Sequence, residues 1–263
     1  DLTVSRSKVA GLANTTRGIF GGGYDGNNFY NTIDYITIAT ASNATDFGDL
    51  TASGQGRMGI AGIASATRGV FGGGMAEDIW EATNVIEYIT IDTTGNSTDF
   101  GDLTSPTKYL AGVSNATRGI FGGGYEEDNY GRTNVMDYIT IDTLGNATDF
   151  GDLTAVRQSF AGCANATRGI FAGGNDDSSD ETNFIEYITI ATTGNATDFG
   201  DLTVARSYLA GLASSTRGVF GGGYVQYDAV KTTIDYITID TTGNATDFGD
   251  LTVAITSLAG LSS

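Results

Sequence analysis

The sequence contains no histidine, one cysteine and one proline among 263 residues. Without histidine the chain lacks the commonest general base and a common metal ligand, so we predict no enzyme, no metal site and no cofactor. The single cysteine, Cys163, cannot form a disulfide within the chain. A membrane-spanning helix needs about 20 consecutive apolar residues, and no apolar run in the sequence is nearly that long. We therefore expect no membrane insertion.

Positive charge is also scarce. Lysine and arginine number 13 against 31 acidic residues, which gives a net charge of −18. Such a charge repels phosphate backbones, so we expect no nucleic acid partner. It also disfavours adsorption to an anionic membrane surface.

Glycine is abundant, with 39 residues, and much of it lies in one recurring phrase, Arg-Gly-aliphatic-Phe followed by a glycine-rich turn. The arginines that open this phrase recur at intervals of 49 to 51 residues. They are Arg17, Arg68, Arg118, Arg168 and Arg217. A period of about 50 residues with a Gly-Gly pair after a short apolar run is typical of propeller blades.

Each period holds four short strand candidates separated by turn signals, named here a, b, c and d. In the first repeat they are the Leu-Ala-Gly-Leu-Ala type segment at 9–13, the Arg-Gly phrase at 17–23, the segment 33–38 and the segment 46–50. No segment has helical spacing of apolar residues over three turns. We therefore predict an all-β protein, a single domain over 1–263 built from four-stranded antiparallel blades.

The strands do not divide evenly. Segments b, c and d occur five times, whereas segment a occurs six times, because the final residues 250–263 resemble the first thirteen. We favour a ring of five blades with a redundant sixth inner strand at the C-terminus. Two alternatives are a larger ring whose missing strands come from another chain or from deleted sequence, and a swap of the extra strand into a neighbouring subunit.

The order a–b–c–d, with Gly-Gly ending segment b, resembles the kelch repeat. The tyrosines after the glycines, Tyr24, Tyr125 and Tyr224, match that pattern too. Where kelch repeats usually carry tryptophan in the last strand, this chain has phenylalanine, as at Phe47 and Phe100. The sequence of the repeats is also similar to that of repeats in virion structural and tail-fibre proteins of bacterial viruses, particularly marine ones. That resemblance implies a location on a virion or outside the cell.

The five b–c segments differ most between repeats, whereas the a–b and c–d turns barely vary. Because successive strands alternate in direction, the b–c loops and d–a linkers should share one face of the disc. We call it the loop face and predict that it binds a surface glycan or a protein partner. The candidate ligand-binding residues are Phe29, Tyr30, Trp80, Tyr130, Arg132, Tyr227, Lys231, Arg57, Lys108, Arg157 and Arg206.

The charges that recur in every repeat favour a structural role. We predict ion pairs between the arginine that opens segment b and an aspartate of segment d. The residues in this structural set are Arg17, Arg68, Arg118, Arg168, Arg217, Asp49, Asp102, Asp152, Asp201 and Asp250.

Two functions follow from these patterns. The first is a non-enzymatic receptor-binding, glycan-binding or adhesin propeller that uses the loop face. The second is a structural propeller that mediates protein–protein assembly in a virion or an extracellular complex, and it leaves a homo-oligomer open.

Overall fold

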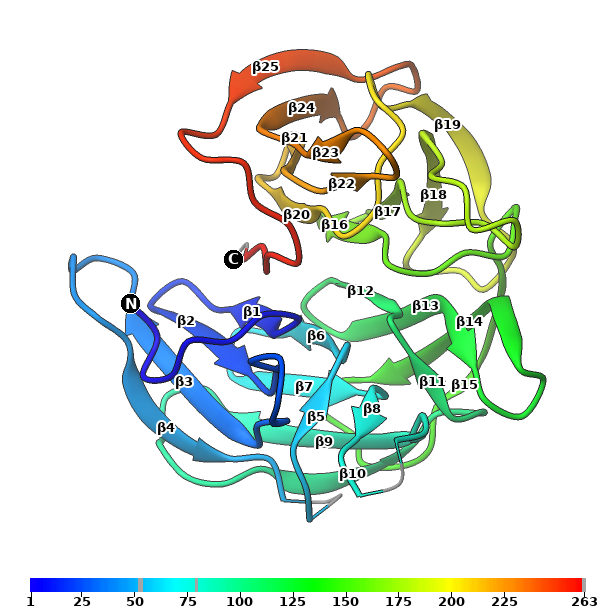
Figure 1. Ribbon diagram of the computed structural model, residues 1–263. Coiled ribbons are helices and arrows are strands. Elements are labelled where there is room, and N and C mark those ends of the chain that lie inside the picture. Colours follow the sequence, from blue (N-terminus) through cyan, green and yellow to red (C-terminus); the bar gives the residue numbers. More distant parts are fainter. Residues whose placement is uncertain (52–53, 79, 262–263) are drawn as a thin grey trace.

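The structure is a computed structural model that describes residues 1–51, 54–78 and 80–261. These residues form strands, turns and loops, and none of them lies in a helix. Accordingly, no helix in this part of the chain is long and apolar enough to cross a membrane. Five four-stranded antiparallel sheets stand as blades around a common axis (Figure 1), which confirms the predicted propeller fold.

The blades use the predicted strands in the predicted order. Blade 1 contains β1 (Ala10–Ala13), β2 (Arg17–Gly21), β3 (Thr32–Thr37) and β4 (Thr45–Asp49). Blade 2 contains β6 (Ala61–Ala64), β7 (Arg68–Gly72), β9 (Val85–Thr90) and β10 (Thr98–Asp102). Blade 3 contains β12 (Ala111–Ser114), β13 (Arg118–Glu126), β14 (Gly131–Thr140) and β15 (Thr148–Asp152).

Blade 4 contains β16 (Ala161–Ala164), β17 (Arg168–Ala172), β18 (Phe184–Thr189) and β19 (Thr197–Asp201). Blade 5 contains β20 (Ala210–Ala213), β21 (Arg217–Gly221), β24 (Thr233–Thr238) and β25 (Thr246–Asp250). In every blade the first strand lies nearest the axis and the fourth forms the rim. The inner strands are rich in Ala and Gly, which fit where neighbouring blades crowd together.

Short additional strands join the d–a linkers to the b–c loops. β5 (Arg57–Met58) pairs with β8 (Met75–Ala76), and β11 (Thr107–Lys108) pairs with the end of β13. The b–c loop of blade 5 forms its own ribbon, β22 (Tyr224–Val225) with β23 (Ala229–Val230). Loops and linkers therefore share one face, as the strand directions predict.

Apolar cores lie between consecutive blades. In the first, Phe47 of blade 1 packs with Phe71 and Ile91 of blade 2. Equivalent cores join blades 2 to 3, 3 to 4 and 4 to 5 in the part of the chain that the structure describes. The near-continuous apolar sequence of the third strands follows from this, because both of their faces are covered.

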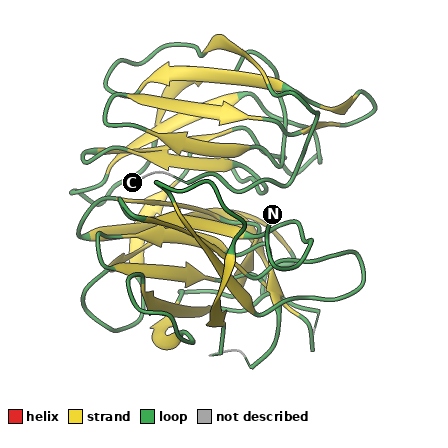
Figure 2. Ribbon diagram, turned by 90° about the vertical axis from the view of Figure 1, so that its left-hand side faces the viewer, coloured by secondary structure: helices red, strands yellow, loops and turns green. Residues whose placement is uncertain are grey.

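The sixth inner segment lies within the ring. An alanine Cβ at Gly11 of β1 would lie 2.8 Å from the Gly260 carbonyl oxygen and 2.8 Å from the Leu261 side chain. The corresponding Cβ at Gly62 of β6 would lie 2.7 Å from the Gly11 carbonyl oxygen. Residues 258–261 thus occupy a sixth inner position between β20 and β1, and Figure 2 shows both termini at this level of the molecule.

Candidate functional site: the axial circle and the loop face

Six linker residues form a closed circle around the axis on the loop face. Each backbone N–H donates to the carbonyl of the preceding member, at 2.7 to 3.3 Å, and the last bond joins Lys8 to Ser257. All six have positive φ, between 54° and 63°. The members are Lys8, Gly59, Tyr109, Ser159, Tyr208 and Ser257. Their backbones are equivalent, but their side chains differ: two members are tyrosine, two are serine, one is lysine and one is glycine.

A pocket of about 100 Å³ lies at the centre of this circle. The rings of Tyr109 and Tyr208 meet edge to face, with centroids 6.4 Å apart. Ser159 is 8% exposed, and its hydroxyl has no hydrogen-bond partner among the described residues. A buried hydroxyl without a partner is costly unless water or a ligand satisfies it. The pocket therefore offers aromatic walls and at least one free polar group.

Lys8 stands beside two of the tyrosines. Its Nζ lies 5.4 Å from the ring centroid of Tyr109 and 5.9 Å from that of Tyr24, within range of cation–π attraction. Partial burial of the ammonium lowers the pKa of Lys8. Burial, with smaller contributions from Tyr208 and Tyr24, raises the pKa of Tyr109 to about 12. The Tyr109 hydroxyl therefore stays protonated at neutral pH and can donate a hydrogen bond.

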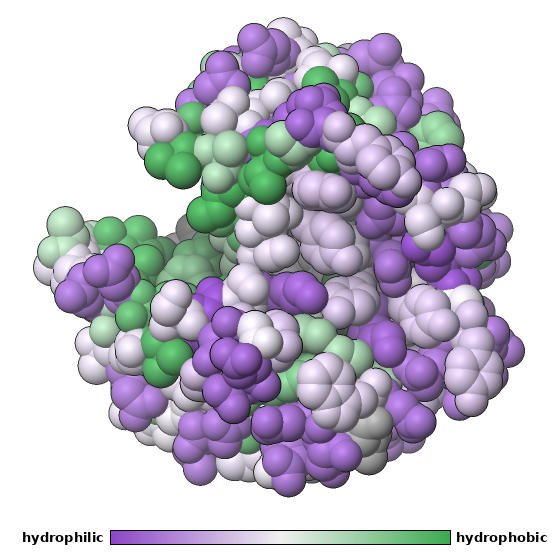
Figure 3. Space-filling view, in the orientation of Figure 1, coloured by the Kyte–Doolittle hydropathy of each residue, from purple (hydrophilic) through white to green (hydrophobic). Residues whose placement is uncertain are grey.

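An aromatic cluster extends from this pocket toward the rim. The Phe29 ring lies 5.1 Å from Tyr24 and 4.9 Å from Trp80. Phe29 itself is buried with Met58 and Met75 beneath the loops, whereas Trp80 is exposed. Phe29 thus supports the cluster and Trp80 presents its surface. Figure 3, which views this face, shows pale rings bordering the axis.

Three of the predicted ligand-binding arginines are buried and cannot contact a ligand on the surface. Arg57, Arg157 and Arg206 are 0% exposed. Each forms an ion pair with the acid of the third strand in its own blade, namely Glu87, Glu186 and Asp235. Arg6 does the same with Asp34, at 3.0 Å. The prediction that these three arginines bind a ligand is therefore wrong, because the linker turns each of them inward, which the sequence alone does not reveal.

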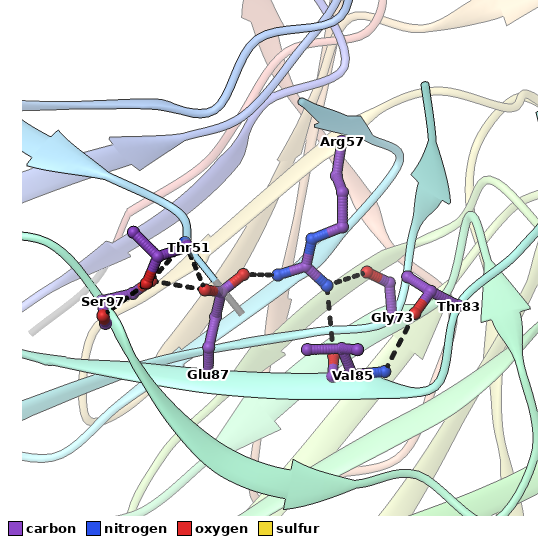
Figure 4. A network of polar contacts seen from close by, with 7 residues as sticks. All are labelled: Thr51, Arg57, Gly73, Thr83, Val85, Glu87 and Ser97. Atoms are coloured by element: carbon purple, nitrogen blue, oxygen red, sulfur yellow. Dashed lines mark hydrogen bonds and ion pairs between the residues drawn. The ribbon is translucent and has the colours of Figure 1, made fainter. Parts of the chain in front are cut away.

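Figure 4 shows this network in blade 2. The Arg57 guanidinium donates to the carbonyls of Gly73 and Val85 as well as to Glu87. The other Glu87 oxygen accepts from the Thr51 backbone and from the Ser97 hydroxyl. One buried pair therefore ties the linker, the blade and a residue just after the outer strand of the preceding blade together. Both terminal nitrogens of the guanidinium donate within it, whereas Nε has no partner among the described residues.

The other predicted loop residues are spread over the face. Lys108 pairs with Glu127 at 2.8 Å and lies 5.0 Å from the Tyr125 ring, and Lys231 pairs with Asp228. The Tyr30 hydroxyl donates to Asp25, and Arg132 donates to Ser179. Tyr130 and Tyr227 are highly exposed at loop tips. Among the predicted residues, only Phe29 and Trp80 are brought together by a direct ring contact in the described part of the chain.

The arginines that open the second strands also differ from expectation. Each guanidinium stacks on the tyrosine of the neighbouring third strand, as Arg118 does on Tyr138 at 4.6 Å. In blades 1 to 4 it also donates to a carbonyl of the next blade, as Arg118 does to Ile190 at 3.1 Å. No ion pair among the described residues joins these arginines to the second aspartate of the fourth strand. Their contacts are structural, but the predicted partner is wrong.

Blade 3 lacks one of the buried pairs. Its linker carries Thr107 at the position of the arginines, so Asp137 is buried opposite a threonine. Burial raises the pKa of Asp137, although the Thr104 backbone and hydroxyl donate to it. A cavity of about 50 Å³ adjoins both Thr107 and Asp137. It lies where the guanidinium stands in the other blades.

The opposite end of the axis is more uniform. A cavity of about 400 Å³ is lined by the inner strands and by the a–b turns, mostly Gly, Ala, Ser and Asn. Cys163 borders it, and burial raises the pKa of this thiol to about 12. Among the described residues no three His, Cys, Asp or Glu side chains lie close enough to hold a metal ion. This end offers small polar groups that repeat from blade to blade.

Sequence reasoning missed Lys8, Tyr109 and Tyr208 as site residues. The signal is present in the linkers, two residues after each position equivalent to Arg6, Arg57, Arg157 and Arg206. Aligning the linkers on those arginines places the residues of the circle in one column. That column changes from lysine to glycine, tyrosine or serine, whereas the residue that follows it is apolar in every linker.

Comparisons with known proteins support the fold. No protein-family model matches the chain, and no curated protein sequence matches it. Among solved structures, one described as "Structure of YjhT" superposes with a TM-score of 0.81 at 9% sequence identity. The match covers 99% of this chain and 88% of that one. At this identity the likeness shows a shared propeller fold and carries no further conclusion about function.

Proposed function

We propose that this chain is a non-enzymatic, kelch-like binding propeller that takes a glycan on its loop face, centred on the axial circle. One observation carries the proposal. Six positions with equivalent backbones carry four different residue types, around a pocket with aromatic walls and a serine hydroxyl that has no partner among the described residues. Positions that only maintain a blade would be expected to repeat with it.

The chemistry of the pocket favours a sugar. Aromatic planes at Tyr109, Tyr208 and Trp80 provide apolar contact, and hydroxyl and ammonium groups can orient a ligand. The net charge of −18 opposes an anionic ligand, so a neutral glycan fits best. Trp80 and the outer loops would extend contact to further residues of a chain-like glycan.

A glycan array followed by titration calorimetry tests this proposal. We expect Tyr109→Ala to weaken the bound glycan at least tenfold, about 1.4 kcal/mol, because buried aromatic contacts dominate such sites. Trp80→Ala should also weaken binding of the same glycan. Leu144→Ala, in a c–d turn on the opposite face, should leave binding unchanged. Binding to no glycan, or equal binding by Tyr109→Ala and the parent, would contradict the proposal.

We propose that the protein is located on a virion surface or in an extracellular complex, because the sequence of its repeats is similar to that of repeats in virion and tail-fibre proteins. Neither nucleic acid nor a membrane interior is a proposed partner, given the charge and the lack of long apolar runs. A receptor-binding propeller at the tip of a fibre would present its loop face outward.

The second candidate function is a structural propeller whose loops contact other proteins or copies of itself. It is favoured by the exposed tyrosines at the loop tips, since Tyr227 is 96% exposed without a ring contact in the described residues. Light scattering of the parent and of Tyr130→Ser/Tyr227→Ser discriminates the two functions. A stable oligomer that this double variant dissociates, together with a blank glycan array, favours assembly.

A further inference from the structure

The ring has six angular positions, of which five hold complete blades. The axial circle of backbone hydrogen bonds has six members, and the inner glycine contacts also close over six segments. Leu261 occupies, relative to Gly18, the place that Leu12 occupies relative to Gly69, with its Cδ1 2.6 Å from a Cβ built on the glycine in both cases. Residues 258–261 therefore hold the register of an inner strand at the sixth position.

The first residues of the chain occupy the other end of that position. The Asp1 carbonyl accepts from Ala44 N–H at 2.8 Å, as the Asp49 carbonyl accepts from Ser97 at 2.9 Å. Thr3 donates to Asp34 from its backbone and hydroxyl, as Thr104 does to Asp137. Asp1 and Thr3 thus stand where a fourth strand would end and lead into its linker. The sixth position contains an inner segment and the end of an outer strand, with the middle of the blade between them open.

Both walls of this seam are apolar and uncovered. On the blade 5 wall, Phe248 is 56% exposed, whereas the equivalent Phe199 is 2% exposed. Leu212 of the same wall is 42% exposed, and its equivalent Leu12 is 4% exposed. On the blade 1 wall, Ile38 is 49% exposed, and its equivalents in other blades are buried. Figure 3 shows this seam as a notch with hydrophobic walls, and Figure 2 shows the strands of the molecule from that side.

Several groups on the walls of the seam lack the partner that their equivalents have between other blades, and these groups indicate which side chains would fit there. In blades 1 to 4 the second-strand arginine donates to the carbonyl of the next blade's third strand, but the Arg217 guanidinium has no such acceptor in the described chain. The matching carbonyl on the other wall, that of Ile38, accepts from no arginine within the described ranges. A Cβ at Gly221 would meet only Ile234, at 3.9 Å, whereas one at Gly21 would meet the Phe71 ring at 2.6 Å. The seam thus has a vacant place for a phenylalanine.

An asparagine in the c–d turn also links each blade to the preceding one. The side-chain oxygens of Asn96, Asn146, Asn195 and Asn244 each accept from a backbone N–H of the preceding blade's fourth strand. The equivalent N–H of blade 5 belongs to Asp250 and has no such partner among the described residues. The seam therefore requires an arginine, a phenylalanine, an aliphatic third strand and a turn asparagine in one sheet.

We propose that the seam binds one further repeat of this type, a three-stranded antiparallel sheet with the second, third and fourth strands of a blade. The same groups appear in the five repeats of this chain, with the geometry that the walls demand. A second copy of this chain is a poorer occupant, because its own repeats are already packed within its ring and only its seam walls are uncovered. The proposal does not depend on ligand binding at the axial circle.

Thiol protection tests the proposal, because the only native cysteine is buried. Phe248→Cys places a reactive thiol on the wall, and Leu144→Cys provides a control of similar exposure, 54%, in blade 3. The probe is a peptide with the sequence of residues 115–151, added to the full chain; it ends before the positions that Asp1 and Leu2 already hold. We expect it to slow labelling of Phe248→Cys at least tenfold and to leave Leu144→Cys unchanged.

Two further arms keep the result decisive. The same peptide with Phe121→Ser should not protect. A chain with residues 114–151 fused after residue 261, which keeps the register of the repeat, should show the same protection if free peptide associates poorly. Absence of protection in both the peptide and fusion arms would overturn the proposal. So would protection without peptide, which indicates a second copy if it grows with protein concentration and a self-closed ring if it does not. Leu212→Cys repeats the measurement should Phe248→Cys disturb folding.

Discussion

Thr107 is the residue that most clearly breaks the internal pattern of charge. The linkers into blades 1, 2, 4 and 5 each supply an arginine to a buried acid. With Thr107 in that position, Asp137 forms no ion pair among the residues that the structure describes. A buried carboxylate without an opposite charge is destabilising in its ionised form. The adjoining cavity of about 50 Å³ provides part of the space that a guanidinium needs.

We predict that Thr107→Arg raises thermal stability at pH 7. The gain should be about 1 to 3 kcal/mol, or several degrees in Tm, because it pairs a charge that is already buried. Thr107→Met is the control for added volume, and Thr107→Arg/Asp137→Asn should lose the gain. Calorimetry of the four proteins makes the comparison, and an equal gain in Thr107→Met would contradict the ion-pair explanation.

The same site should depend on pH with a defined sign. Burial raises the pKa of Asp137 above its unfolded value, so the folded state binds the proton more tightly and ionisation costs stability. The cost is therefore present above the folded pKa and disappears as the pH falls toward about 4, the value for an unfolded aspartate. The advantage of Thr107→Arg should shrink over the same interval, as a pH series of the melting measurement would show.

At the scale of elements, the bulge between the third and fourth strands sets the contact between blades. Gly101 has φ of +147°, and a Cβ there would meet the backbone of Gly145 and Asn146 in the next blade. Gly249 forms the same bulge in blade 5, with φ of +133° and nothing within 4 Å. The pair therefore separates backbone strain from contact between blades.

We predict that Gly101→Ala destabilises the protein more than Gly249→Ala. Both substitutions incur strain of about 1 to 3 kcal/mol at positive φ, and Gly101→Ala adds a clash of similar size. Chemical denaturation of both variants measures the difference. Equal losses would mean that the bulge matters only for its φ or that the blade 5 wall is covered in solution.

The elements were the part most open to prediction from sequence. Period, turn residues and β-branched runs are local properties, so the strands, their order and the shared face of loops and linkers followed from them. The side-chain partners that pair across a blade were harder to predict. The arginine of a linker and the acid of a third strand lie about 30 residues apart, as with Arg57 and Glu87, and only the path of the linker decides which arginine faces inward. The circle that contains Lys8, Tyr109 and Tyr208 forms only when all six linkers meet around the axis, so no single linker sequence predicts it.

At the scale of the whole molecule, stability should vary around the ring. In a repeat architecture each blade is stabilised mainly by its neighbours. Blades 2, 3 and 4 have covered faces on both sides, whereas blades 1 and 5 each present one open wall, marked by Ile38 and Phe248. Local opening is easiest where apolar contact is least. In hydrogen exchange we therefore predict that β3 and β24 exchange at least tenfold faster than the equivalent strands β9, β14 and β18. Uniform protection of all five would contradict an open seam, and selective slowing of β3 and β24 by the repeat peptide would link the gradient to its cause.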